Sequence, residues 1–244
     1  MSAAEERLGN DPTSELWGEH RSRYRFANDV LGDAPQRVLD VACGSGFGLQ
    51  LLASAGACPF GVDYDATALA EVRALQPDSQ LLRADAAVLP LPDESVDAIV
   101  CFETIEHVLD ARALVFELRR VLRAGRPLVL STPNRAFHQF TTNPFHVREF
   151  TANELRSLVG EAFGDVRLFG QFPASTYRYV PFRMLRPTYA PGALAWKVLV
   201  RLPFGLNNRL ALALSGRPLY PGETDYCFPP ESTHGSHALV AVAR

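Results

Sequence analysis

The chain has few cysteines, and they form no pattern typical of a metal site or a disulfide framework. Its 244 residues contain four, which are Cys43, Cys58, Cys101 and Cys227. None of them forms a C-x-x-C pair or a zinc-binding spacing. Three of the four lie in predicted core strands or beside a glycine-rich turn, so we expect buried thiols in a reducing cytosol.

The chain also lacks a long apolar run and a strong net charge. No uninterrupted apolar stretch approaches the roughly 20 residues of a membrane-spanning helix. The N-terminus carries Glu5 and Glu6, whereas a secretory signal is basic and then apolar. A net charge of −3 gives no general attraction to nucleic acid or to a membrane surface. These absences predict a cytoplasmic protein without a transmembrane segment.

A third absence is regional, because no Asp or Glu occurs between Val166 and Gly222. Bases are interleaved there with aromatics and prolines, and they are Arg167, Arg178, Arg183, Arg186, Lys197, Arg201, Arg209 and Arg217. Ala193–Leu202 and Leu206–Leu214 are predicted as short amphipathic helices. Three interpretations stay open: a structural cap or homodimer surface, a lid that meets an anionic or lipid-linked substrate, and a helix on a membrane surface.

What the sequence does contain is a nucleoside-binding signature. The apolar run Val38–Val41 leads into the glycine-rich turn Ala42–Gly48, and a second short strand ends in Asp63, 17 residues after Gly46. In such a βαβ unit the glycines let a ligand approach the backbone, and the acid binds ribose hydroxyls. The spacing is G-x-G-x-G, not the dinucleotide G-x-G-x-x-G, and Asp40 would repel a pyrophosphate but can hold an ammonium group. S-adenosylmethionine, an adenosine joined to an amino acid without phosphate, fits these features.

With this motif the sequence resembles the class I methyltransferase family over about residues 20 to 170. Leu81–Ala86 is similar to the family's third strand, whose final acid, here Asp85, faces the adenine amine. Ser95–Phe102 is similar to the fourth strand, and Arg119–Ser131 to a helix, a turn and the fifth strand. The resemblance implies cofactor contacts at the carboxyl ends of the first four strands. These contacts are Asp40, Ala42, Gly44, Gly46, Asp63, Tyr64, Asp85, Ala86 and Phe102.

Strands and helices alternate along the chain, which predicts an α/β fold with a doubly wound, mostly parallel sheet. The resemblance implies a seven-stranded, Rossmann-like methyltransferase fold, with a helix over residues 14–32 that closes over the cofactor. Thr151–Glu154 is predicted to form a capping box at the start of a helix. The predicted domains are a cofactor-binding core over 1–170, a basic and aromatic cap or lid over 171–236, and the last core strand over 237–244. The cap or lid is thus an insertion between strands six and seven.

A second group of polar residues is placed where a methyl acceptor would bind. Glu103, Glu106 and His107 directly follow the fourth strand, and His146 lies on the long loop after the fifth. Ligands of open parallel sheets bind outside the carboxyl ends of the strands. We therefore expect these four side chains to face the cleft beside the methyl donor.

The pattern E-x-x-E-H followed by a distant histidine resembles the metal site of small-RNA 3′-terminal ribose methyltransferases. Ubiquinone-pathway catechol methyltransferases carry its E-x-x-E-H part. The resemblance implies that Glu103, Glu106, His107 and His146 bind Mg²⁺ or Mn²⁺ and, through it, a vicinal diol. Two alternatives stay open. His107 or His146 can act as a metal-free general base, or these residues can make only structural hydrogen bonds.

The predicted function is an S-adenosylmethionine-dependent O-methyltransferase of a small molecule or saccharide. Ser131–Arg135 and Asn143–His146 resemble segments of methyltransferases from sugar and polysaccharide pathways. The alternatives are a metal-free methyltransferase with a histidine base and, in another class, a non-catalytic cofactor-binding partner subunit. An RNA ribose methyltransferase is disfavoured by the acidic net charge and the lack of an added RNA-binding module.

Overall fold

The computed structural model describes residues 17–32, 36–137, 143–173, 202, 204–215 and 221–244. The chain divides into two compact units. The first contains Met1–Asn10, Arg23–Phe172 and Cys227–Arg244, and the second contains Asp11–Ser22 and Pro173–Tyr226. All residues predicted for the site belong to the first unit. The functional division into a core and a cap or lid stays a prediction.

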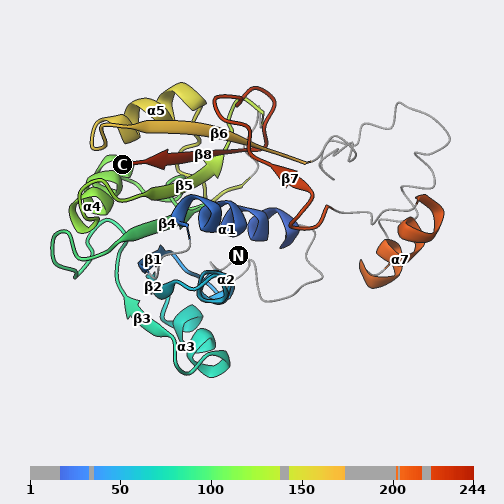
Figure 1. The fold of residues 1–244 in the computed structure, drawn as a ribbon, viewed down its shortest axis with the longest axis horizontal. Helices are drawn as coiled ribbons and strands as arrows, with labels where there is room; N and C mark the ends of the chain where they lie inside the picture. The colour runs from blue at the N-terminus through green and yellow to red at the C-terminus, as the bar shows by residue number, and fades with distance from the viewer. Residues whose placement is uncertain (1–16, 33–35, 138–142, 174–201, 203, 216–220) are drawn as a thin grey trace. The chain divides into compact units, whose positions relative to one another are not determined.

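A single mixed sheet forms the centre of the fold (Figure 1). Its strands are β1 (Arg37–Val41), β2 (Cys58–Asp63), β3 (Gln80–Arg83), β4 (Ala98–Phe102), β5 (Leu128–Pro133), β6 (Val166–Pro173), β7 (Tyr226–Cys227) and β8 (Ala238–Ala243). They lie in the order β3-β2-β1-β4-β5-β8-β6-β7. The neighbours from β3 to β5 pair in parallel, whereas β8 runs antiparallel to β5 and β6. The five parallel strands therefore bring their carboxyl ends to one edge.

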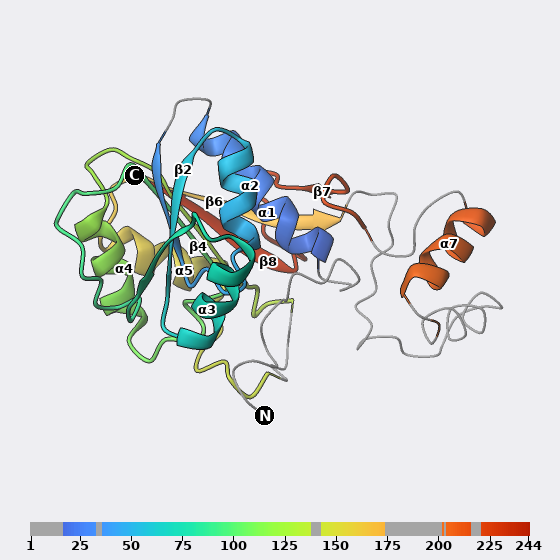
Figure 2. The ribbon, with the colours of Figure 1, turned by 90° about the horizontal axis from the view of Figure 1, so that it is seen from below.

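Helices cover both faces of this sheet, as the alternating pattern predicted. The described helices are α1 (Trp17–Leu31), α2 (Phe47–Ser54), α3 (Ala66–Leu75), α4 (Ala111–Val121), α5 (Ala152–Gly160) and α7 (Phe204–Ser215). Figure 2 shows α1 and α2 on one face and α4 and α5 on the other. Each strand between them is covered on both sides, which explains why β4 and most of β1 and β5 are buried.

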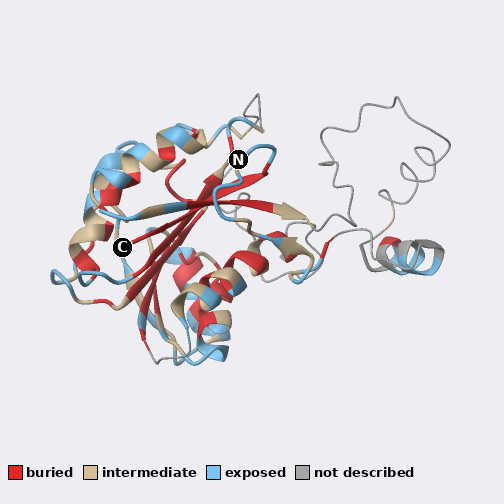
Figure 3. Cartoon of the chain, turned by 45° about the horizontal axis from the view of Figure 1, so that its top comes forward, coloured by how far each residue is buried: buried red, intermediate tan, exposed pale blue. Residues whose placement is uncertain are grey.

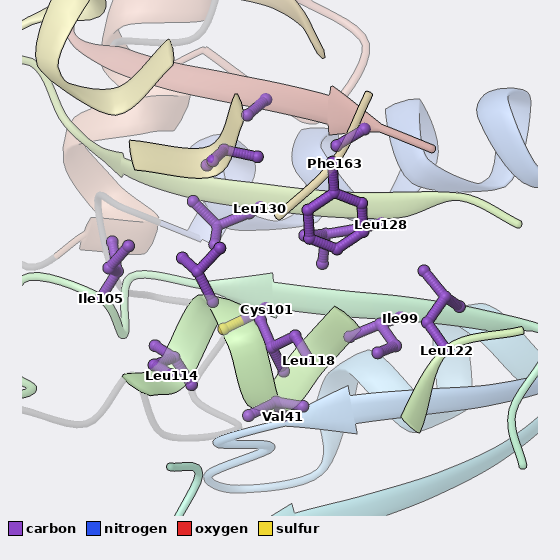
Figure 4. Close-up of a cluster of buried hydrophobic side chains, with 14 of the residues drawn as sticks. Val41, Ile99, Cys101, Ile105, Leu114, Leu118, Leu122, Leu128, Leu130 and Phe163 are labelled. Atoms are coloured by element: carbon purple, nitrogen blue, oxygen red, sulfur yellow. The ribbon is translucent and has the colours of Figure 1, made fainter. Parts of the chain in front are cut away.

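The main hydrophobic core lies between the sheet and the α4–α5 layer. Figure 3 shows buried strands at the centre and exposed outer faces on the helices. Figure 4 shows Ile99 of β4 and Leu130 of β5 in one cluster with Leu114 and Leu118 of α4. The buried residues of α4 recur at helical spacing, so one stripe of this helix faces the sheet.

Side-chain caps begin three of the described helices, α3, α4 and α5. The predicted capping box of α5 is confirmed, because Thr151 accepts from the Glu154 backbone N–H and Glu154 accepts from the Thr151 backbone N–H. Asp65 caps α3 and Asp110 caps α4 in the simpler way, by accepting one backbone N–H each.

Some expectations differ from the structure. The sheet has eight strands instead of seven, because the two-residue β7 adds to its edge beside β6. Cys43 and Cys101 are buried free thiols, but Cys58 is exposed, because it is the first residue of β2 at the strand's outer end. The helix predicted at Leu206–Leu214 is confirmed as α7, whereas most of Ala193–Leu202 lies outside the described residues.

Residues 174–237 separate β6 from β8 along the chain. The role predicted for this insertion, a cap or a lid, rests partly on residues that the structure does not describe and stays a prediction. Among the helices that are described, none combines the length and the apolar character that crossing a bilayer requires.

Candidate active site

The predicted site residues gather at the carboxyl edge of the parallel strands. Two non-glycine residues there have left-handed backbones: Ala42, with φ 58°, follows β1, and Glu103, with φ 48°, follows β4. Such conformations cost of order 1–3 kcal/mol and are concentrated at functional sites. Because β1 and β4 are neighbours in the sheet, both strained turns lie at the same edge. Nothing in the sequence signalled this strain.

The glycine-rich turn after β1 contacts the acid at the end of β2. The Gly44 N–H donates to Asp63 Oδ2 at 2.8 Å, and the Asp65 N–H donates to Asp63 Oδ1 at 2.8 Å. Gly46 has φ 75°, and a Cβ there would lie 2.7 Å from a Val72 methyl carbon, so the turn requires glycine at this position. Asp63 is half-buried, and each of its two carboxylate oxygens can accept more than one hydrogen bond. These residues fit a site for a ribose diol.

The other predicted cofactor contacts on β2 and β3 lie at the strand ends. Tyr64 follows Asp63 and is 71% exposed. Asp85 lies two residues beyond β3, is exposed, and accepts the Ala87 N–H at 2.9 Å, with the half-buried Ala86 between them. Their positions agree with the prediction, and their contacts with a ligand stay predictions.

Asp40 is the buried acid of the site. It is 1% exposed, and the Tyr24 hydroxyl of α1 lies 3.2 and 3.1 Å from its two oxygens. A Cβ on Gly48 would lie 2.1 Å from the Tyr24 ring, so this glycine is required for helix packing. Phe102 packs edge-to-face on the same ring, with centroids 4.9 Å apart. Asp40 therefore has a protein partner already, and its predicted contact with an ammonium group stays a prediction.

Burial raises the pKa of Asp40 from 3.8 to about 7, with a further rise from the nearby Asp63 charge and an opposing effect of the Tyr24 hydrogen bond. In the unfolded chain this acid ionises near pH 4, whereas the folded protein retains the proton to about pH 7. Asp40 therefore favours folding on the acid side, and that contribution is lost as pH rises through about 7. Between about pH 4 and about pH 7, we therefore expect the unfolding free energy of wild type to fall by about 4 kcal/mol relative to that of Asp40→Asn.

Urea denaturation of both proteins across this pH range measures the difference. Asp97→Asn is the matched control, because the backbone N–H of Arg37 lowers the pKa of Asp97. The unfolding free energy of wild type relative to that of Asp97→Asn should not fall as pH rises. A wild-type curve that stays parallel to Asp40→Asn would contradict the raised pKa.

The residues predicted for the acceptor end form a cluster of three. One potential ligand atom from each of Glu106, His107 and His146 lies within 4.8 Å of those of the other two. The His107 and His146 rings meet edge-to-face, with centroids 4.8 Å apart. Two backbone bonds bring the distant segments together, because the Val147 and Arg148 N–H groups both donate to the Glu106 carbonyl.

Both imidazoles are oriented through Nδ1. The carbonyl of Phe145 can only accept, so the proton in its 3.2 Å bond belongs to His107 Nδ1. His146 Nδ1 lies 2.8 Å from a carboxylate oxygen of the buried Glu149 and donates to it. In a neutral imidazole the other nitrogen then has a lone pair. Each histidine thus offers Nε2 as a ligand or as a base.

Glu106 supplies the third group, and it is fully buried. Its Oε2 accepts from the Thr132 hydroxyl at 2.9 Å. Within the part of the chain that the structure describes, Oε1 has no hydrogen-bond partner, and it lies 3.9 Å from His107 Nε2. Burial raises the pKa of Glu106, and the charge of Glu103 raises it further. A buried acceptor facing another lone pair is costly unless a cation or a proton lies between them.

Glu103, the fourth predicted metal ligand, is engaged elsewhere. Its Oε1 lies 3.2 Å from the Arg23 guanidinium and accepts from the Ser131 hydroxyl at 2.9 Å. The cluster of potential ligands among the described residues does not include it. Sequence reasoning missed the roles of Tyr24 and Arg23, because α1 carries several aromatics and arginines at similar spacing. Glu149 was missed as well, although it lies only three residues after His146.

Comparisons with known proteins show what part of this chain is similar to. Residues 39–130 match the family model described as a methyltransferase domain. A Mycobacterium tuberculosis protein named "Probable S-adenosylmethionine-dependent methyltransferase" is 45% identical over 140 residues, which are 55% of this chain and 51% of that protein. A ubiquinone biosynthesis O-methyltransferase of Azoarcus sp. is 32% identical over 139 residues, which are 53% of this chain and 59% of its own. The chain spans about half the length of the first relatives it matches.

Solved structures share the fold. One from Thermotoga maritima, titled as an SAM-dependent methyltransferase and "possible histamine N-methyltransferase", aligns with a TM-score of 0.61 at 16% identity. The match covers 93% of this chain and 90% of that one, and at this identity it shows the fold alone. Residues 39–130 therefore match the model of a methyltransferase domain, and the chain shares the α/β fold of this solved structure.

Proposed function

We propose that this protein is an S-adenosylmethionine-dependent O-methyltransferase that acts on a small molecule or saccharide. In this proposal a divalent metal at Glu106, His107 and His146 holds a vicinal diol of the acceptor. The metal is supported by one observation: one potential ligand atom from each of Glu106, His107 and His146 lies within 4.8 Å of those of the other two, and the buried Glu106 Oε1 has no hydrogen-bond partner among the described residues. One carboxylate and two imidazoles suit a divalent cation.

The cofactor end of the proposal rests on the glycine turn and Asp63. A Cβ on Gly44 would meet no atom within 4 Å, so a ligand can approach the backbone there. Asp63, at the end of β2, is held by two backbone N–H groups and can accept from ribose hydroxyls. When bound, S-adenosylmethionine supplies an electrophilic methyl group on a sulfonium. The name of the Mycobacterium tuberculosis relative supports this cofactor.

The acceptor end requires a deprotonated hydroxyl at neutral pH. A divalent cation held by Glu106, His107 and His146 would lower the pKa of a substrate hydroxyl bound to it. The chain's own residues hold the geometry: Thr132 orients Glu106, the Phe145 carbonyl orients His107, and Glu149 orients His146. The name of the Azoarcus relative supports transfer to oxygen.

A metal-free mechanism is the second candidate, and the same orientation of the two histidines allows it. With Nδ1 protonated, His107 and His146 each have a basic Nε2 that can accept a hydroxyl proton directly. A non-catalytic cofactor-binding subunit is the third candidate, and the buried polar cluster disfavours it, because a scaffold gains nothing from an unsatisfied carboxylate. An anionic or lipid-linked substrate, a homodimer and a cytoplasmic location stay predictions.

The test is methyl transfer from labelled S-adenosylmethionine to a panel of sugars, glycolipids and catechols, with and without EDTA. We expect transfer to a vicinal diol, loss of activity in EDTA and recovery with Mg²⁺ or Mn²⁺. Full activity in EDTA would leave the histidine-base mechanism. Cofactor binding without transfer to any acceptor would favour the partner-subunit alternative.

Glu149 gives a further expectation about this cluster. Replacing it with alanine removes the acceptor that fixes the His146 tautomer, so affinity for Mn²⁺ is expected to fall by about 10- to 100-fold. Glu149→Gln should retain most of the affinity, because an amide oxygen still accepts from Nδ1. Titration of Mn²⁺ by electron paramagnetic resonance measures both. Equal losses of Mn²⁺ affinity in the two variants would contradict the orienting role of Glu149 and indicate that its negative charge matters instead.

A further inference from the structure

Arg23 of α1 pairs with Glu103, which precedes Glu106 of the candidate metal site by three residues. Arg23 is 2% exposed, and its Nε donates to Gln171 Oε1 of β6 at 2.7 Å. Its Nη1 lies 3.2 Å from Glu103 Oε1, the oxygen that also accepts from Ser131. A buried guanidinium cannot lose its proton, so it needs a carboxylate beside it. Glu103 provides that carboxylate.

This pairing changes the donor set that a cation would meet. Without Glu103, the cluster offers one carboxylate, Glu106, and two imidazoles, His107 and His146. Mg²⁺ prefers oxygen ligands and is bound chiefly through carboxylates and waters. Imidazole nitrogens favour first-row transition metals, and two histidines with one carboxylate form a three-ligand face that leaves other positions open.

We propose that Arg23 is a specificity-determining residue of the metal site: by holding Glu103 out of the ligand set, it makes the site bind a first-row transition metal in preference to Mg²⁺. The inference rests on the proposed function, because it concerns the same cluster. Arg23 need not touch the cation. It acts by removing the second carboxylate, the group that a hard cation would need most.

The ligand set is tested with two isosteric variants, Glu103→Gln and Glu106→Gln, by calorimetric titration of Mn²⁺ and of Mg²⁺ without substrate. Wild type should bind Mn²⁺ at least about 10-fold more tightly than Mg²⁺. Glu103→Gln should keep the Mn²⁺ affinity within about 3-fold, whereas Glu106→Gln should lose at least about 100-fold. Equal losses in the two variants would overturn the proposal by showing that Glu103 is a ligand.

The role of Arg23 itself is tested with Arg23→Met and Arg23→Lys. Methionine releases Glu103 beside the site, so the preference for Mn²⁺ over Mg²⁺ should shrink by about 10-fold, toward that of a two-carboxylate site. Lysine keeps a charge for Glu103, and the wild-type preference should persist. An unchanged preference in Arg23→Met would overturn the role of Arg23. If that variant does not fold, the two glutamate variants still decide the ligand set.

The same titration separates this inference from the proposed function. Wild type that binds Mg²⁺ as tightly as Mn²⁺ overturns the inference alone and leaves a metal-assisted methyltransferase. Wild type that binds neither cation overturns the metal part of the proposed function and the inference with it.

Discussion

Replacing His107 with alanine is expected to lower methyl transfer by at least about 100-fold, the lower end for a lost acid–base group. The same loss is expected for His146→Ala. Each imidazole is either a ligand of the proposed cation or the base that accepts the hydroxyl proton, and its Nδ1 is already engaged. Initial rates with saturating S-adenosylmethionine measure the effect.

Cofactor affinity should change little in both histidine variants, because Asp63 and the glycine turn lie on other strand ends and keep their own hydrogen bonds. His234→Ala is the matched control, since this histidine is exposed and is not part of the cluster. Its turnover should equal that of wild type. If His107→Ala and His146→Ala both retain wild-type rates, the cluster has only a structural role.

Replacing Asp63 with alanine is expected to weaken S-adenosylmethionine binding by about 1–3 kcal/mol, which is about 5- to 150-fold in Kd. The ribose hydroxyls lose a charged acceptor. The Gly44 and Asp65 N–H groups also lose the carboxylate that joins the turn to β2. Calorimetric titration with S-adenosylmethionine and S-adenosylhomocysteine measures the change.

Asp65→Ala is the control for this second variant, because Asp65 lies at the same strand end but caps α3 by accepting the Thr67 N–H at 2.7 Å. Removing that cap should cost about 1 kcal/mol of stability and leave cofactor affinity unchanged. Unaltered affinity in Asp63→Ala, or tighter binding of NAD than of S-adenosylhomocysteine, would reject the cofactor assignment.

The fold class could be predicted from the sequence because it depends on local patterns. Mostly apolar runs such as Val38–Val41 predict buried strands. Glycines at a fixed spacing after one of them predict the turn that follows. The capping box Thr151–Glu154 is likewise a signal within four residues. Local signals of this kind need no knowledge of distant contacts. The short β7 was missed because a two-residue strand has no period to detect.

The residue types of the site could be predicted from the sequence, but their hydrogen-bond and ion-pair partners could not. Glu106 and His107 adjoin a strand end, and His146 lies on a later loop. Their residue types and positions were therefore enough to predict them as candidate ligands or bases. The partner of each nominated group comes from elsewhere in the chain: Tyr24 bonds Asp40 across 16 positions, and Arg23 pairs with Glu103 across 80. No sequence spacing encodes such pairs.

By itself, therefore, the sequence determined the order of strands and helices, the glycine-rich turn after β1, and the candidate ligands. Only the tertiary structure decided which partners the two carboxylates have. Glu103 and Glu106 are equivalent as residue types, but one lies against a buried guanidinium and the other faces two imidazoles. The physical reason is that a buried charge must be paired, and the pairing partner is selected by packing in three dimensions.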